Sequence, residues 1–259
     1  MDIDMRLSIS FLVWLLNAAL LAGCGLNQEK PDETKDWSPQ RIYKAAKDEI
    51  NSGNNEKGIK LLETLQARYP YGRYAQQAQL DEAYAYYKEG EVPQALAAAD
   101  RFIKLHPNHL NVDYAYYLKG LCNFRDDLGP FGYFSTDDLA ERDPKAARES
   151  FDTFRELVTK YPQSRYAPDA IKRMNYLVNA LATHEVKVAD YYYRRGAYLA
   201  ATNRAQEALN TYPQAPALEE ALSIMVKSYQ AMGLKDLAAD ANKVLQKNFP
   251  QSKYLSGKS

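Results

Sequence analysis

The chain has 259 residues with 33 basic and 33 acidic side chains, so its formal net charge is zero. No net positive field draws it toward nucleic acid or an anionic membrane surface, which argues against direct nucleic-acid binding. Its 21 tyrosines, beside 12 glycines and 12 prolines, suit a helical globular protein with many amphipathic contact surfaces.

The first 23 residues predict a signal peptide. After Arg6, an apolar run from Leu7 to Gly23 is close to the lower length limit for crossing a bilayer, so length alone does not separate an anchor helix from a signal. The run ends in Leu21-Ala22-Gly23-Cys24, which resembles the bacterial lipobox. In that motif, cleavage precedes a cysteine that receives a diacylglycerol and an N-acyl chain. We therefore expect lipidation at Cys24; the alternative is an uncleaved signal anchor with an incidental cysteine.

Residues 24–37 predict a lipidated flexible tether, because they are polar and rich in turn-forming residues. The second position of the mature chain is Gly25. In the bacterial lipoproteins that this motif resembles, aspartate at that position favours retention in the inner membrane, so Gly25 indicates the outer membrane. The other cysteine, Cys122, is expected to be a small buried residue on a helix. With Cys24 acylated, no intramolecular disulfide is expected.

A proline preceded by an aromatic residue or histidine recurs five times. The fifth residue before the proline is mostly large and apolar, whereas the twelfth is always small. A small residue at a fixed position lets two helices approach closely, which predicts a helix-turn-helix repeat. The prolines are Pro70, Pro107, Pro162, Pro213 and Pro250; the large positions are Leu65, Phe102, Leu157, Ala208 and Leu245; the small positions are Gly58, Ala95, Ser150, Ala201 and Ala238.

The order of these residues resembles the tetratricopeptide repeat, and it predicts an all-α solenoid of five such repeats. Two of the proline intervals are 37 residues, near the roughly 34 of that repeat. The two longer intervals need extra residues, which we assign to a loop insertion at 124–143 and to a lengthened helix over 174–195. The folded region then divides into N-terminal repeats over 38–123 and C-terminal repeats over 144–259.

Helix boundaries follow from capping signals. Ser38-Pro39 predicts the start of the first helix, and residues 51–55 break it before the second. Asp143-Pro144 repeats the same signal. The remaining helices are expected at 74–88, 92–105, 112–124 and 143–161, with two further pairs after Pro168 and Pro216.

No pattern in the sequence indicates catalysis, a metal or a cofactor. His106 and His109 have the spacing of a ligand pair, but Pro107 lies between them, so a turn with ordinary polar contacts is the better interpretation. His184 is isolated, and the acidic run at 136–143 is better explained as a solvated face or a helix cap. Nucleophile, zinc-protease and phosphate-loop motifs are absent. We expect a protein that is not an enzyme.

Several longer strings together are similar to the BamD (YfiO) family of lipoproteins, which belong to the machine that folds β-barrel proteins into the bacterial outer membrane. The resemblance implies a periplasmic solenoid anchored to the outer membrane by its lipid. It also implies that the C-terminal half binds the central barrel subunit, that accessory lipoproteins are supported, and that the N-terminal half meets unfolded outer-membrane proteins. The strings are RYPYGRYAQQAQLDEAYAYYK, DRFIKLHP, NVDYAYYLKGL, RDPKAARESF and VADYYYRRGAY.

Two sets of site residues follow. Tyrosines on the first helices, with an arginine nearby, could hold the aromatic residue and free carboxylate that commonly end a barrel protein; the alternative is that all these tyrosines are packing residues. For the partner, Arg194 and Arg195 point in different directions, so one can pair with Asp190 while the other projects. We favour Arg195, which matches the family's arginine before Gly-Ala. The expected groove residues are Tyr71, Arg73, Tyr74, Tyr84, Tyr87 and Tyr116.

Two other classes of function fit a lipid-anchored solenoid. One is a scaffold for periplasmic cell-wall enzymes, which partner identification would distinguish. The other is a solenoid joined to a lytic enzyme, but the repeats use the whole chain after Ser38. The role of the last residues, which carry a more regular proline signal than we expect of the family, stays open.

Overall fold

The computed structural model describes residues 32–128 and 144–255, and within them it is built of helices without strands. The ten helices of these ranges follow one another as five antiparallel pairs. The pairs are α2 (Pro39–Asn51) with α3 (Asn55–Arg68), α4 (Arg73–Glu89) with α5 (Val92–Leu105), α6 (Val112–Leu128) with α7 (Lys145–Lys160), α8 (Ala167–Arg194) with α9 (Tyr198–Thr211), and α10 (Leu218–Ala231) with α11 (Lys235–Asn248).

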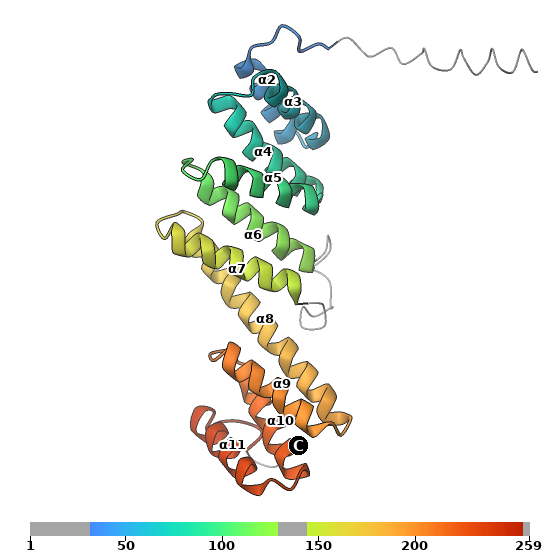
Figure 1. The fold of residues 1–259 in the computed structure, drawn as a ribbon, viewed down its shortest axis with the longest axis vertical. Coiled ribbons are helices and arrows are strands. Elements are labelled where there is room, and N and C mark those ends of the chain that lie inside the picture. Colours follow the sequence, from blue (N-terminus) through green and yellow to red (C-terminus); the bar gives the residue numbers. More distant parts are fainter. Residues whose placement is uncertain (1–31, 129–143, 256–259) are drawn as a thin grey trace, which may run out of the picture.

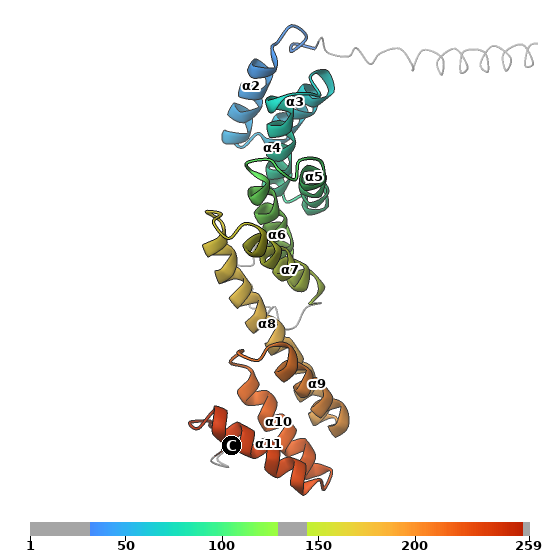
Figure 2. The same ribbon diagram turned by 60° about the vertical axis from the view of Figure 1, so that its left-hand side comes forward.

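The pairs stack into one elongated solenoid, from α2 and α3 at one end to α11 at the other (Figure 1). Each helix packs against the next along the chain, and first helices of neighbouring pairs also touch, as α2 does with α4, α4 with α6, and α8 with α10. The rotated view shows the same extended stack (Figure 2). The predicted all-α solenoid of five helix-turn-helix repeats is confirmed.

The second helix of each pair stops at the residue before the repeated proline. These five residues share one backbone conformation, with φ between −128° and −131° and ψ between 54° and 68°, and each N–H donates to the carbonyl four residues earlier. A proline disfavours the helical conformation of the residue that precedes it, so the helix cannot continue. The proline signal therefore acts as a stop at the same place in each repeat.

The two repeated positions inside the second helices are both buried. Ala95, Ser150 and Ala201 have no exposed surface, and neither do Phe102 and Leu157. At Gly58 a Cβ atom would lie 2.4 Å from Cγ1 of Ile50, so no larger residue fits between α2 and α3. The small position is where the two helices of a pair meet most closely, and the large position fills the adjoining space.

The turns inside the pairs depend on glycine in four repeats. Gly90 illustrates this: its φ is 82°, it donates to the carbonyl of Tyr87, and the next residue, Glu91, donates to Tyr86. This is the Schellman arrangement, which needs a left-handed residue that glycine adopts without strain. The turn of the third repeat lies within 129–143, outside the described residues.

Most predicted boundaries agree with the structure. The Ser38 hydroxyl accepts from the Arg41 N–H as an N-cap, and Pro39 is the first helical residue. Two boundaries differ. Helix α7 begins at Lys145, after Pro144, which offers no side-chain cap, and Asp143 lies outside the described residues. Helix α6 continues to Leu128, beyond the predicted end at 124.

Helix α8 is 28 residues long, and it absorbs the extra length of the fourth repeat as predicted. The Glu185 side chain on α8 is 4% exposed and accepts from Arg148 of α7 and Arg204 of α9, each at 3.2 Å. One buried carboxylate therefore joins three helices from two repeats. Since a buried charge that loses its partners is costly, this contact fixes how the third and fourth repeats meet.

The outer face of α11, the last helix of the described residues, is more polar than the faces that join successive pairs. In the four preceding second helices, the fourth, eighth and eleventh residues before the proline are buried or half-buried where the next first helix packs. In α11 these positions are Gln246, Asn242 and Ala239, and two of the three are exposed. A polar terminal face of this kind caps a solenoid and keeps it soluble.

The small position gives a stability prediction. Ala95→Leu places three further carbon atoms where α5 has no free space, so the free energy of unfolding should fall by about 1–3 kcal/mol in chemical denaturation. The matched control is Ala97→Leu, the same change on an exposed position of the same helix, which should stay within about 0.5 kcal/mol of the wild type. Equal effects at the two positions would contradict the close-packing account.

Candidate functional site

We single out six of the half-buried aromatic residues that lie along the first helices of the N-terminal three repeats and at the start of the fourth. We call them the aromatic band. Each keeps part of its ring accessible while the remainder packs against a neighbour, which is the arrangement of a surface that can both fold and bind. The band consists of Tyr43, Tyr74, Tyr114, Tyr117, Phe124 and Tyr166.

The band starts at the α2–α4 contact. The rings of Tyr43 and Tyr74 are 5.5 Å apart, and the Arg73 guanidinium lies 4.9 Å above the Tyr74 ring. Arg73 is exposed and also donates to the Tyr74 hydroxyl at 3.2 Å. Tyr71, in the preceding loop, is 92% exposed. A cation and two aromatic faces are thus presented together at this end of the solenoid.

Asp81 on α4 holds the Tyr43 end of the band in place through hydrogen bonds to α2. It is 6% exposed and accepts from the Tyr43 hydroxyl at 2.6 Å and from the Lys47 ammonium at 3.1 Å. Burial and the hydrogen bond to Asp81 raise the pKa of Tyr43 well above its ordinary value. The Tyr43 hydroxyl therefore keeps its proton, and the contact with Asp81 positions the ring.

The middle of the band is a tyrosine stack. Tyr166 stacks on Tyr117 with centroids 4.7 Å apart and lies 5.3 Å from Tyr114. The Tyr117 hydroxyl donates to Asp169 at 2.6 Å, and burial together with this hydrogen bond raises the pKa of Tyr117 to about 12. The Arg165 guanidinium lies 4.8 Å above the Tyr166 ring, as Arg73 does over Tyr74.

The band ends at an ion pair on α8. Arg173 donates to Asp169 at 2.6 Å, and its guanidinium lies 4.8 Å above the Phe124 ring. Burial alone would raise the pKa of Asp169, but the hydrogen bonds from Tyr117 and Arg173 outweigh it and lower that pKa. The carboxylate is therefore satisfied within the protein.

The expected groove residues divide into three groups. Tyr71, Arg73 and Tyr74 lie together at the accessible end of the band. Tyr84 and Tyr87 are half-buried and pack against the core clusters of the first two repeats. Tyr116 is 7% exposed and lies 5.7 Å from the ring of Tyr161, so the structure places it in the core.

Sequence reasoning did not single out Tyr43, Tyr166, Asp169 or Arg173. A signal for Tyr166 was present: "RYA" occurs at 73–75 and again at 165–167, each time with the arginine over the adjacent tyrosine. Asp169 and Arg173 form an ordinary i, i+4 pair, and nothing in the sequence shows that Tyr117, 52 residues earlier, completes it.

The second expected site lies at the end of α8. Arg194 pairs with Asp190 at 2.8 Å, four residues earlier, as the sequence predicted. Arg195 is exposed at the helix C-cap, with its guanidinium 5.2 Å above the Tyr191 ring. A surface pocket beside them, between α8 and the start of α10, is lined by Asp190, Tyr191, Arg194 and Glu220 among others.

The remaining candidates fall outside the site. Cys122 is fully buried on α6, which confirms the prediction. His106 accepts or donates at 2.9 Å with Gln79, and both His106 and His109 pack on Phe102. Cys24 and Gly25 lie outside the described residues. Within the described ranges, no group of three or more metal-ligating side chains comes together, and no helix is long and apolar enough to cross a membrane.

The fold is that of a tetratricopeptide-type solenoid, a class that binds other proteins along the surface of its stacked helices. A family model described as "Outer membrane lipoprotein" (YfiO) matches residues 35–245. The chain belongs to this YfiO family, and it is accordingly an outer-membrane lipoprotein.

Two bacterial relatives support this membership. The chain is 48% identical over 223 residues to the outer membrane protein assembly factor BamD of Neisseria meningitidis serogroup A, covering 86% of this chain and 84% of the relative. It is 38% identical over 234 residues to that of Vibrio cholerae serotype O1, covering 90% and 96%. Among solved structures, a tetratricopeptide-repeat protein of Thermus thermophilus is 15% identical, with a TM-score of 0.38 over 85% of this chain and 95% of that one.

The ion pair at the end of the band gives a testable pKa. Folding lowers the pKa of Asp169 below its ordinary value of 3.8. Its carboxylate therefore stabilises the fold fully at pH values above 3.8, and this contribution is lost as the pH falls through the lower pKa of the folded state. Tyr117→Phe removes one hydrogen bond and should raise the pKa of Asp169 toward 3.8 in an NMR titration of its carboxyl carbon. Tyr114→Phe, which removes a hydroxyl from the same band without touching that bond, should leave it unchanged. An unchanged pKa in Tyr117→Phe would refute the assigned contact.

Proposed function

We propose that this chain is a non-catalytic scaffold of the machinery that assembles β-barrel proteins in the outer membrane, held at its periplasmic face by diacylglycerol and an N-acyl chain on Cys24. Its N-terminal half binds unfolded outer-membrane proteins, its C-terminal half docks the central barrel subunit, and it supports accessory lipoproteins of the same complex. Membership of the family and the names of the relatives support this assignment.

The observation that carries the substrate proposal is the pairing of exposed cations with half-buried tyrosines along the band. The terminal segment of a barrel protein offers an aromatic ring and a free carboxylate, and Arg73 and Tyr74 present their complements 4.9 Å apart. A carboxylate held by an arginine gains a charge-assisted hydrogen bond, and a ring gains stacking on an already positioned tyrosine. Asp81 and Asp169 are already paired within the protein. The exposed arginines over the band tyrosines, Arg73 and Arg165, are therefore the charges that meet the ligand.

The peptide test compares two forms of one peptide, which differ only in whether the C-terminal carboxylate is free or amidated. Arg73→Gln should weaken binding of a barrel C-terminal peptide about five- to tenfold when its carboxylate is free, and should have little effect when that end is amidated. Arg155→Gln is the matched control, because Arg155 is also an exposed arginine over a ring, 5.5 Å from Phe151, but lies on the second helix α7. Fluorescence anisotropy gives the affinities. Equal losses for both end groups, or equal binding of peptides with scrambled ends, would show nonspecific adhesion.

The docking proposal rests on the different environments of two adjacent arginines. Arg194 is engaged by Asp190, whereas Arg195 meets a ring and keeps its guanidinium at the surface. A desolvated, bidentate arginine–carboxylate pair across an interface loses about 2–5 kcal/mol when one partner is truncated. Arg195 is therefore the residue that we assign to a carboxylate on the periplasmic domain of the barrel subunit.

Arg195→Glu should prevent or strongly weaken co-purification of the barrel subunit while the melting temperature stays unchanged, and a compensating charge reversal on the partner should restore it. Arg194→Glu is the control, since it perturbs the adjacent local ion pair and should weaken co-purification less. If Arg195→Glu co-purifies normally while folded, the contact lies elsewhere on the solenoid. Recovery of cell-wall enzymes in place of barrel-assembly subunits would support the alternative scaffold.

A further inference from the structure

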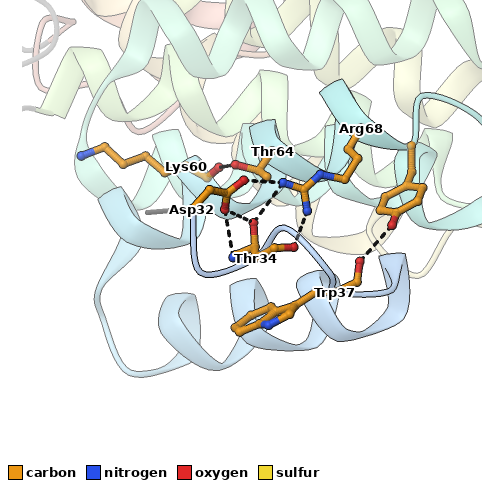
Figure 3. Close-up of polar contacts among 7 residues, drawn as sticks. Asp32, Thr34, Trp37, Lys60, Thr64 and Arg68 are labelled. Atoms are coloured by element: carbon orange, nitrogen blue, oxygen red, sulfur yellow. Dashed lines mark hydrogen bonds and ion pairs between the residues drawn. The ribbon is translucent and has the colours of Figure 1, made fainter. Parts of the chain in front are cut away.

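The segment just before Ser38, the N-cap of α2, is not a free tether. Residues 32–37, which we call the strap, fold against the end of α3 (Figure 3). The Asp32 carboxylate accepts from the Thr34 N–H at 2.9 Å and from its hydroxyl at 2.6 Å, which closes a turn, and Thr34 is only 8% exposed. The part of the predicted tether that the structure describes is therefore ordered.

Arg68, in the last turn of α3, ties this turn down. Its guanidinium donates to the Asp32 carboxylate at 2.6 Å, to the Thr34 hydroxyl at 3.3 Å, and to the Thr34 carbonyl (Figure 3). Hydrogen bonds from Thr34, followed by the charge of Arg68, lower the pKa of Asp32, so the pair is ionised at neutral pH. Three donors of one side chain thus hold a segment that precedes the helical fold.

The other end of the strap is fixed as well. The Tyr69 hydroxyl donates to the Trp37 carbonyl at 2.9 Å, and the Arg41 guanidinium lies 4.3 Å above the Trp37 ring. Tyr69 is also the residue that stops α3 before Pro70. The residues that hold the strap, Arg68 and Tyr69, are therefore also the residues at which α3 ends, and the loop that carries Tyr71 follows them directly.

Ordering a segment outside the repeats costs conformational entropy, and a chain that needed only a long flexible link would gain nothing from it. What the ordered strap changes is the reach of the anchor, which is the greatest distance that the chain after Cys24 can span before it meets the folded structure. From Cys24 to Asp32 there are eight residue steps, which span at most about 28 Å; from Cys24 to Ser38 there are fourteen, which span at most about 50 Å.

We propose that the contact of Arg68 with the strap sets the reach of the lipid anchor, and thereby holds the N-terminal end of the solenoid, with Tyr71 and Arg73, close to the membrane surface. This inference rests on the proposed lipidation of Cys24. It places the accessible end of the aromatic band beside the bilayer into which barrel proteins insert.

Trypsin measures whether the strap is held. In the membrane-bound full-length lipoprotein, the Lys30-Pro31 bond resists trypsin because proline follows it, so the first susceptible site is Lys35, inside the strap. Asp32→Ala and Arg68→Gln should each speed release of the folded domain from the membrane about fivefold or more, because cleavage follows the population of the open strap. Lys60→Gln is the control, since Lys60 lies on the same helix but pairs with Glu56.

Asp32 precedes every helix of the described residues, so its variant keeps the experiment valid if Arg68→Gln unfolds. Release rates equal to the wild type in both variants would overturn the held strap. The same digestion is carried out on soluble Cys24→Ser protein, with the loss of residues 32–35 as the readout. It measures opening of the strap without the lipid, and so distinguishes an unheld strap from a failure of lipidation. If wild-type protein does not sediment with membranes, the lipid assignment fails while the strap is still measured.

Energy transfer measures the reach itself. A donor on Tyr71→Cys, in a Cys122→Ala background, is paired with acceptor headgroups in vesicles that carry the lipoprotein. Transfer should fall in Arg68→Gln and in a variant with six residues inserted between Pro31 and Asp32, and should not change in Lys60→Gln. If the insertion lowers transfer and Arg68→Gln does not, the strap does not set the reach.

Discussion

The whole solenoid depends on the closest approach of two helices at one small residue, followed by a helix stop before a proline. Ala95 and Ala201 are fully buried at that approach, and Tyr69 and Tyr212 adopt the same backbone conformation at the stop. Together these set the length of each second helix and its distance from the first. Because the unit is nearly the same five times, each repeat places its first helix beside the previous pair, and side chains far apart in sequence become neighbours.

The aromatic band is a consequence of that repetition. Tyr117 and Tyr166 are 49 residues apart but stack at 4.7 Å, because α6 and the start of α8 belong to successive repeats. The same geometry brings Tyr43 of α2 against Tyr74 of α4. Half-burial lets these rings stabilise the contact between repeats while part of each side chain stays accessible, already fixed at little further cost in side-chain entropy.

Sequence patterns predicted the repeat well and the site less well. The proline stops, the small positions and the long α8 depend on local physics, namely helix termination and close packing, which a sequence displays directly. Whether a tyrosine faces the core or the accessible surface of the solenoid depends on how its helix is rotated about its axis relative to the two helices that it packs against. Tyr116 and Tyr117 are adjacent in sequence, yet one is a core residue and the other carries the band.

The strap was beyond sequence reasoning for a different reason. Its residues are polar and turn-forming, which is typical of a flexible link, and its order depends on Arg68, which lies 34 residues after Thr34. No local pattern predicts that contact. By contrast, the i, i+4 pair of Asp190 with Arg194 was predictable because both partners lie on one helix.

The most direct test of the central claim is crosslinking with mass spectrometry in native outer membranes that hold a stalled barrel substrate. The account predicts that the last residues of the substrate crosslink to the α3–α4 loop and the adjoining aromatic band, while the barrel subunit crosslinks near the end of α8. Substrate crosslinks confined to the second helices α9 and α11, with none in the N-terminal half, would contradict it.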